Sequence, residues 1–349
     1  MTRNAASRLF DLTQPLLSRL PPEPAHTLSL RALTLTWRLL QTPRAAARGA
    51  PIACLGLEFA NVLGLAAGCD KSGDYLDALG SLGFGHIEIG TVTPRPQRGN
   101  DRPRLFRYPA QRAVVNRMGF NNKGIDHVVA RLQRRRYRGI CGVNIGKNAD
   151  TPLARAEDDY RICFRKAYAV ADYFVINVSS PNTPGLRGLQ SEEGLERIVA
   201  ALFEERGRLA AVTARRVPIL VKIAPDLALP EVAALAVLIR RLELDGVVAT
   251  NTTTDLGSVG MHGGVAGGSD SGGLSGAPLH PRSLSVIRQL RAALGLAFPI
   301  IGVGGICDAA TAAETLQAGA NLIQFYTGFI FRGPGLIDEI LSRETPVQG

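Results

Sequence analysis

The segment that decides the fold reads YFVINV at residues 173–178, LERIVAALFEERGR at 195–208 and ILVKI at 219–223. The first and last runs are rich in Val and Ile and do not alternate cleanly with polar residues, as is typical of parallel strands buried on both faces. The stretch between them is helical in pattern. Together they predict one β-α-β unit of a parallel sheet.

The same alternation continues on both sides of this segment. Short apolar runs stand at residues 62–66, 86–90, 142–145, 173–178, 219–223, 246–250, 300–303 and 322–326. Eight β-α units in one chain favour an α/β fold of the (β/α)8 TIM-barrel type over an open doubly wound sheet. Two connections, 91–140 and 257–276, are long enough to be lids or binding segments, and we expect a mobile loop at 257–271.

Residues 1–45 precede this pattern and predict two short helices around a proline-rich break at 21–24. The apolar arc of residues 27–41 is about twice the ~100° that one packing contact needs. The second helix therefore either packs on the body alone or contacts both protein and lipid. We expect a helical extension at 1–45, a barrel domain at 46–349, no membrane-spanning helix and no secretory signal.

The composition excludes several functions. The 349 residues carry a net charge of +10, which suits a solvated arginine-rich surface, an anionic substrate or an anionic membrane. The basic run RLQRRRYR (131–138) predicts the exposed face and end of an amphipathic helix, and its lack of regularly spaced aromatic residues argues against nucleic-acid binding. The five cysteines and five histidines show no metal-ligand spacing, so we expect reduced, buried cysteines in a cytosolic protein and no metal site.

In such a barrel the active site lies where the strands end. Polar residues follow most of the runs, and amides are prominent among them: Asn116, Asn144, Asn177, Asn182 and Asn251. A single asparagine after a strand is usually a turn residue. Several that converge on one face would form a rim of amides suited to a small ring with alternating C=O and N–H groups.

The last two runs end in glycines, at Gly304-Gly305 and Gly328, and the segment 272–276 adds more. Glycine turns at this place let backbone N–H groups approach an anion, which predicts a phosphate-bearing cofactor. Neither a G-x-G-x-x-G nor a P-loop motif is present, so the sequence does not indicate a dinucleotide fold or a nucleotide-triphosphate site.

These motifs together resemble the dihydroorotate dehydrogenases, and specifically their membrane-associated, quinone-reducing class. The resemblance extends over nearly the whole chain from about residue 15. It rests on AAGCDK (66–71), GTVTPRPQRGN (90–100), NRMGFNN (116–122), NIGKN (144–148), NVSSPNTPGLR (177–187), ATNTT (249–253), SGGLSG (271–276) and GVGGI (302–306).

The resemblance implies one FMN per chain and a substrate site beside it. The FMN contacts that it implies are Ala67, Gly68, Thr91, Asn144, Asn177, Lys222, Thr250, Gly276, Gly305, Tyr326 and Thr327. The substrate contacts that it implies are Lys71, Asn116, Arg117, Met118, Gly119, Phe120, Asn177, Asn182, Asn251 and Thr252. Lys71 would face the flavin and the substrate carboxylate, and Lys222 would balance the charge of the reduced flavin.

The implied reaction is the oxidation of dihydroorotate to orotate in pyrimidine biosynthesis. One carbon loses a proton to a base, and its neighbour loses a hydride to the flavin. The base of this class is the second serine of N-V-S-S-P-N, here Ser180, where the soluble class has cysteine. A serine hydroxyl acts as a base only when it is well placed and helped by a relay or a buried site. On its own, Ser180 would be interpreted as a loop serine that caps a turn.

The resemblance also implies a quinone that reoxidises the flavin near His26, Arg107 and Tyr326, although a helix-capping role suits His26 equally well. It places residues 1–45 in peripheral contact with lipid, on the cytoplasmic side of a bacterial inner membrane. Two other functions are compatible with parts of the sequence. One is an FMN barrel enzyme with a soluble acceptor such as fumarate or NAD, and the other is a colourless basic protein that binds membrane or nucleic acid.

Overall fold

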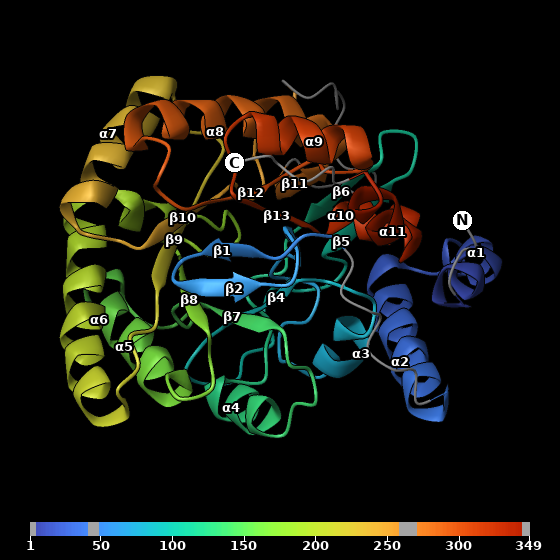
Figure 1. Ribbon diagram of the computed structural model, residues 1–349, viewed down its shortest axis with the longest axis horizontal. Coiled ribbons are helices and arrows are strands. Elements are labelled where there is room, and N and C mark those ends of the chain that lie inside the picture. The colour runs from blue at the N-terminus through green and yellow to red at the C-terminus, as the bar shows by residue number, and fades with distance from the viewer. Residues whose placement is uncertain (1–4, 41–48, 258–270, 344–349) are drawn as a thin grey trace.

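The computed structural model describes residues 5–40, 49–257 and 271–343 and places a closed barrel of eight parallel strands at the centre of the protein (Figure 1). Around the barrel the strands follow the order β3 (Leu63–Leu65), β4 (His86–Val92), β7 (Ile140–Ile145), β8 (Tyr173–Asn177), β9 (Ile219–Ile223), β10 (Gly246–Ala249), β12 (Ile300–Val303) and β13 (Leu322–Phe325). Each coincides with one of the eight apolar runs, so the predicted (β/α)8 fold is confirmed.

Helices surround these strands and bury their own apolar faces against them (Figure 1). They are α3 (Leu76–Gly80), α4 (Ile125–Gln133), α5 (Ala156–Ala167), α6 (Glu192–Thr213), α7 (Leu229–Arg241), α8 (His280–Leu294), α9 (Ala309–Gln317), α10 (Thr327–Arg332) and α11 (Gly335–Leu341). Three single 3-10 turns, at Leu153–Arg155, Leu186–Gln190 and Ala277–Leu279, complete the connections. The barrel is a packed core with apolar layers both inside it and between strands and helices.

A small hairpin closes the amino-terminal end of the barrel. It consists of β1 (Ile52–Cys54) and β2 (Leu57–Phe59), paired antiparallel. Phe59 packs edge-on against His86 at the start of β4, with ring centroids 5.3 Å apart. Because this end is filled with side chains, the opposite end is left for ligands, as the position of active sites in such barrels requires.

The two long connections are more ordered than the sequence suggested. The first contains β5 (Leu105–Tyr108) and β6 (Ala113–Asn116), and the second contributes β11 (Gly273–Gly276), which pairs with β6. The three strands form a sheet next to the carboxyl ends of the barrel strands. The loop expected at 257–271 falls largely outside the described residues. The basic run also differs from its prediction, because α4 ends at Gln133 and most of the run follows the helix.

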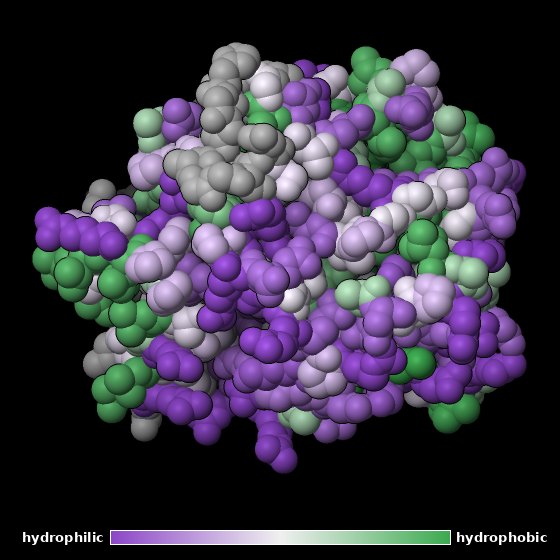
Figure 2. Space-filling view, turned by 180° about the vertical axis from the view of Figure 1, so that it is seen from behind, coloured by the Kyte–Doolittle hydropathy of each residue, from purple (hydrophilic) through white to green (hydrophobic). Residues whose placement is uncertain are grey.

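The predicted N-terminal helices are present as α1 (Ala5–Leu17) and α2 (Pro22–Leu40), separated by a short turn (Figure 1). Hydrophobic residues gather at the left margin of Figure 2, where these helices lie. Leu12 on α1 and Leu39 on α2 are 79% and 73% exposed, so part of the apolar arc does not pack on the barrel. None of the described helices is long and apolar enough to cross a membrane.

Candidate functional site

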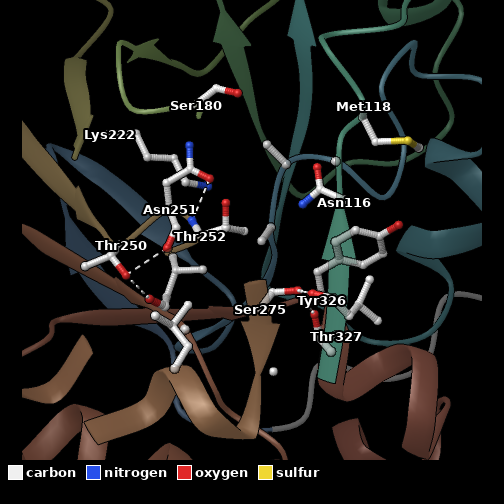
Figure 3. Close-up of a pocket in the computed structure, with 18 of the residues that line it drawn as sticks. Asn116, Met118, Ser180, Lys222, Thr250, Asn251, Thr252, Ser275, Tyr326 and Thr327 are labelled. Carbon is white, nitrogen blue, oxygen red and sulfur yellow. Dashed lines mark hydrogen bonds between the residues drawn. The ribbon is translucent and has the colours of Figure 1, made fainter. Parts of the chain in front are cut away.

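One pocket opens where the barrel strands end, and most of the predicted residues line it (Figure 3). The predicted residues in its wall are Ala67, Gly68, Lys71, Thr91, Asn116, Met118, Gly119, Phe120, Asn177, Ser180, Asn182, Lys222, Thr250, Asn251, Thr252, Gly276, Gly305, Tyr326 and Thr327. They come from segments more than 250 residues apart in the chain. Closing the barrel brings them together, since parallel strands in a ring all end on the same side.

Three of the five amides predicted to form a rim, Asn144, Asn177 and Asn251, are joined into one hydrogen-bonded chain. The Asn144 side-chain oxygen accepts from the Thr91 hydroxyl at 2.5 Å and from Nδ2 of Asn177 at 3.2 Å. Asn177 also donates to the Thr91 hydroxyl at 2.7 Å. Asn144 is fully buried and lies behind the pocket wall, not in it. Its role in this geometry is to hold Thr91 and Asn177, which do line the pocket.

Asn251 extends the chain toward the pocket. Its Nδ2 donates to the Ser179 hydroxyl at 2.9 Å, and its Oδ1 accepts the backbone N–H of Thr252 at 2.8 Å. The Thr252 hydroxyl oxygen is buried without a hydrogen-bond partner among the described residues. A buried hydroxyl without a partner is costly, so this oxygen marks a place where a polar ligand group fits.

Ser180 stands in the loop that follows β8 and lies on the same side of the pocket as Lys222 and Asn251, across from Asn116 and Met118 (Figure 3). Its side chain is almost fully buried. The hydroxyl oxygen accepts the backbone N–H of Asn182 at 3.3 Å. This contact fits the turn-capping alternative, but it uses only one lone pair, so the hydroxyl remains available to a ligand in the pocket.

The opposite wall is fixed to the Ser180 loop by side-chain amides. Nδ2 of Asn182 donates to Oδ1 of Asn116 at 2.9 Å, and Nδ2 of Asn100 donates to the Asn182 carbonyl at 3.1 Å. Arg117 is turned away from this wall, since its guanidinium lies 5.3 Å from the centre of the Phe106 ring and donates to the Pro103 carbonyl. The amide pair holds the two sides of the pocket at a set spacing.

Two lysines supply positive charge. Nζ of Lys71 donates to the Gly68 carbonyl at 2.9 Å, and burial lowers the pKa of Lys71 to about 8. Nζ of Lys222 lies 3.9 Å from Oε1 of Glu88, a carboxylate with no exposed surface. Burial lowers the pKa of Lys222, and the charge of Glu88 partly offsets that effect. An ammonium group in such a dry site interacts strongly with an anion.

The far end of the pocket is formed by backbone. Within the described residues, the amide N–H groups of Gly305 and Ile306 donate to no protein acceptor. Helix α10 begins beside them at Thr327, whose hydroxyl donates to Ser275 at 2.8 Å. A Cβ at Gly305 would lie 2.4 Å from the Cβ of His280, and the residue has φ +75°. The glycine is therefore needed for the turn that presents these N–H groups, as well as for close approach of an anion.

Three residues predicted near a quinone lie where α1 and α2 meet the barrel. Nε2 of His26 is 3.0 Å from the Cys69 carbonyl oxygen, and its ring packs edge-on against Tyr326 at 6.0 Å. His26 thus bridges α2 to the end of β3 instead of capping a helix, and burial lowers its pKa to about 4. The Arg107 guanidinium donates to the carbonyls of Ser18 and Leu20, just after α1. Tyr326 is the residue of the three that lines the pocket.

A second contact joins α2 to the loop that carries Asn100, through ion pairs of Glu23. The Glu23 carboxylate accepts from the Arg104 guanidinium at 2.7 Å and from that of Arg102 at 3.0 Å. Burial raises the pKa of Glu23, but the two guanidiniums together lower it by more than burial raises it. The pKa of Glu23 therefore lies below its usual value. Arg104 also donates to the carbonyls of Arg98 and Asn100. The first turn of α2 therefore helps to hold the loop that carries Asn100.

These features fit the flat, phosphate-bearing group that the sequence predicted. The Gly305 and Ile306 N–H groups suit a phosphate, the amides suit a ring with alternating C=O and N–H groups, and Lys222 suits a ring that becomes anionic. The fold and the pocket together define the class of protein: a (β/α)8 barrel with a pocket lined by amides and lysines at the carboxyl ends of its strands.

Comparisons with known proteins identify the family. Residues 50–344 match the family described as "Dihydroorotate dehydrogenase". A "Dihydroorotate dehydrogenase (quinone)" of Cellvibrio japonicus is 52% identical over 331 residues, 94% of this chain and 96% of that protein. One of Pseudomonas aeruginosa (strain LESB58) is 51% identical over 338 residues, 96% and 97% of the two chains. The chain belongs to the dihydroorotate dehydrogenase family, and it is an oxidoreductase.

Solved structures agree with this assignment. The ligand-free DHODH of Eimeria tenella has a TM-score of 0.81 and 35% identity, over 92% of this chain and 93% of that one. The same enzyme in complex with ferulenol has a TM-score of 0.80, over 90% and 89% of the two chains. The family implies a flavin as cofactor and a quinone as co-substrate.

Sequence reasoning missed several residues that shape the site. Ser179 positions Asn251, Ser275 contacts Thr327, and Asn100 holds Asn182. Ser275 stands within a motif that was noticed for its glycines. Glu88 carried the clearest signal, since a carboxylate in the apolar run HIEIG must be paired when it is buried.

Proposed function

We propose that this protein oxidises dihydroorotate to orotate in pyrimidine biosynthesis, with FMN as hydride acceptor and a membrane quinone as the final electron acceptor. The observation that carries the proposal is the full-length identity of about half to relatives named "Dihydroorotate dehydrogenase (quinone)". The pocket supports it, because a serine, two ammonium groups and a chain of amides converge there.

The residues proposed to hold FMN form two groups, one for its phosphate and one for its ring. The N–H groups of Gly305 and the start of α10 suit the phosphate, and Thr91, Asn177 and Lys222 suit the ring. When bound, FMN supplies the hydride chemistry, which no amino-acid side chain can provide.

The substrate is proposed to lie between the amides and Ser180. Asn116, Asn182, Asn251 and Thr252 can pair with its ring groups, and the ammonium group of Lys71 can bind its carboxylate. The Ser180 hydroxyl oxygen takes the proton, because it is buried at the pocket wall and already held by the Asn182 N–H. Water exclusion by Met118 and Phe120 strengthens these polar contacts.

Residues 1–45 are proposed to form a separate extension from the barrel at 46–349, and to contact lipid peripherally on the cytoplasmic side of an inner membrane. The exposed Leu12, Leu16 and Leu39 support this, since an apolar helix face without a protein partner suits the lipid interface. A quinone arriving from the bilayer would reach the pocket near His26 and Tyr326, whose rings are in contact.

The experiment that tests the proposal is anaerobic mixing of the yellow holoenzyme with dihydroorotate. We expect the flavin absorbance to bleach and to return on addition of ubiquinone but not of fumarate. Return with fumarate alone would support the soluble-acceptor alternative instead. A purified protein without flavin absorbance would contradict the proposal and favour a non-enzymatic binding protein.

The pH dependence of substrate binding gives a further prediction. The Lys71 ammonium form is present below its pKa of about 8 and is lost as the pH rises through that value. We therefore expect kcat/KM for dihydroorotate to fall by about tenfold per pH unit above pH 8. Lys71→Arg stays charged in this range and should abolish the decline. A decline that persists unchanged in this variant would assign it to another group.

A further inference from the structure

Glu88 is a buried carboxylate that the reaction as proposed does not use. It lies on β4 inside the barrel with no exposed surface. Its Oε1 accepts from Nδ2 of Asn144 at 2.8 Å, and its Oε2 accepts from Nε2 of Gln324 at 3.0 Å. Burying a carboxylate costs free energy of folding. We therefore expect Glu88 to have a function that offsets this cost.

The contact with Asn144 determines which way that amide points. A carboxylate can only accept hydrogen bonds, so the Asn144 NH2 group must face Glu88. The Asn144 oxygen must then face the opposite way, where it accepts from Thr91 and Asn177. A side-chain amide without such a neighbour can bind in either orientation.

The orientation passes along the chain to the pocket. Because the Asn177 NH2 group is directed to the Asn144 oxygen, the Asn177 oxygen faces the other way and accepts from the Ser179 hydroxyl at 3.2 Å. The same oxygen lies 3.4 Å from Nδ2 of Asn251. Asn251 is thereby held with its oxygen on the Thr252 N–H. One acceptor at the barrel centre thus orders three amides.

Glu88 also faces the ammonium group of Lys222, which lines the pocket, with Nζ 3.9 Å from its Oε1. Burial favours the neutral amine, and Glu88 is the charged neighbour that opposes this effect. Burial favours the neutral form of two further titratable groups near Glu88. Tyr173, which accepts a hydrogen bond from Gln324, has a pKa raised by burial, and His86 on the same strand has its pKa lowered to about 3 by burial.

We propose that Glu88 is a positioning residue, which sets the hydrogen-bond direction of the Asn144–Asn177–Asn251 chain and supplies the counter-charge for the Lys222 ammonium group in the pocket wall. The inference rests on the proposed function, since it concerns the same site. Flavin bleaching of the wild-type holoenzyme by dihydroorotate tests that function separately, before any variant is made. The Glu88 variants are then compared in holoenzyme alone.

The first test is the midpoint potential of the flavin as a function of pH in Glu88→Gln. This variant is equal in size and keeps an acceptor for Asn144, but it removes the charge. In a plot of midpoint potential against pH, the slope changes at the pKa of a group that interacts with the flavin. We expect the slope change caused by Lys222 to occur about 1–3 pH units lower in this variant, the usual effect of removing a close opposite charge. The change caused by Lys71 should stay near pH 8 and serves as the internal control.

A charge-swap variant separates this effect from general damage. Glu88→Gln with Gln324→Glu returns one carboxylate to the barrel centre, on a side chain now 3.0 Å from Glu88. We expect the slope change to return toward its wild-type position. An unshifted slope change in the single variant, or no return in the double variant, overturns the charge part of the proposal.

The second test uses Glu88→Asp, which keeps the charge but draws the carboxylate away from Asn144. We expect the dissociation constant of orotate, measured from flavin absorbance changes, to rise by about tenfold, because a hydrogen bond to a charged group is lost. The slope change that Lys222 causes in the potential should move less than in Glu88→Gln, because the negative charge stays in the barrel near Lys222. Unaltered orotate affinity overturns the orientation part, and this variant also carries the test if Glu88→Gln does not fold.

Discussion

Replacing Ser180 with alanine is expected to slow flavin reduction by dihydroorotate by about three orders of magnitude, while the flavin stays bound. A base positioned in a buried site contributes roughly 10²–10⁴-fold, and alanine removes the hydroxyl that is proposed for this role. The measurement is single-turnover bleaching at saturating dihydroorotate. Flavin content, measured from the absorbance of the purified variant, is the control for an intact pocket.

The variant also removes a structural contact, because the Ser180 hydroxyl accepts the Asn182 N–H. The role of Ser180 as a base and its role in holding Asn182 affect different kinetic constants. Loss of the base lowers the limiting rate of bleaching, whereas a displaced Asn182 weakens substrate binding and raises the concentration needed for half the limiting rate. A normal limiting rate with weakened binding would leave Ser180 as a turn-capping residue.

Ser180→Cys is the matched variant. A thiol is a stronger acid than a hydroxyl, so its anion is available at lower pH. We expect a measurable limiting rate, well above that of Ser180→Ala, which rises with pH as the thiol ionises. Equal rates in the two variants would argue that the side chain at this position carries no proton.

Removing residues 1–40 is expected to abolish quinone-dependent turnover and also to weaken dihydroorotate binding. Substrate binding is affected because the deletion removes Glu23 and leaves the nearly buried Arg104 guanidinium without its carboxylate. Breaking such a pair costs roughly 3–5 kcal/mol, which would loosen the loop around Asn100.

Glu23→Gln tests separately how much the Glu23–Arg104 contact contributes to dihydroorotate binding. We expect this variant to raise KM for dihydroorotate by about tenfold, with little change in quinone-dependent kcat. Glu58→Gln, an exposed acid on β2, is the control and should behave as wild type. If the deletion weakens dihydroorotate binding and Glu23→Gln does not, the loop is held by another part of the extension.

The sequence by itself determined the fold. Each apolar run became a barrel strand within one or two residues, because a run of Val and Ile buried on both faces has few other stable arrangements. It also determined which segments form the pocket, since residues after parallel strands of a barrel must meet at one end. Residues 173–183 show both, with a strand that leads directly into Ser180 and Asn182.

Only the tertiary structure decided which of these residues face the pocket and which stand behind it. Asn144 and Asn177 lie near the ends of the neighbouring strands β7 and β8, yet one is a support and the other lines the wall. The Glu88–Lys222 and Glu23–Arg104 pairs join residues 134 and 81 positions apart. Hydrogen-bond direction and ion pairing depend on distances of a few ångströms between segments remote in the chain, and local sequence pattern does not specify them.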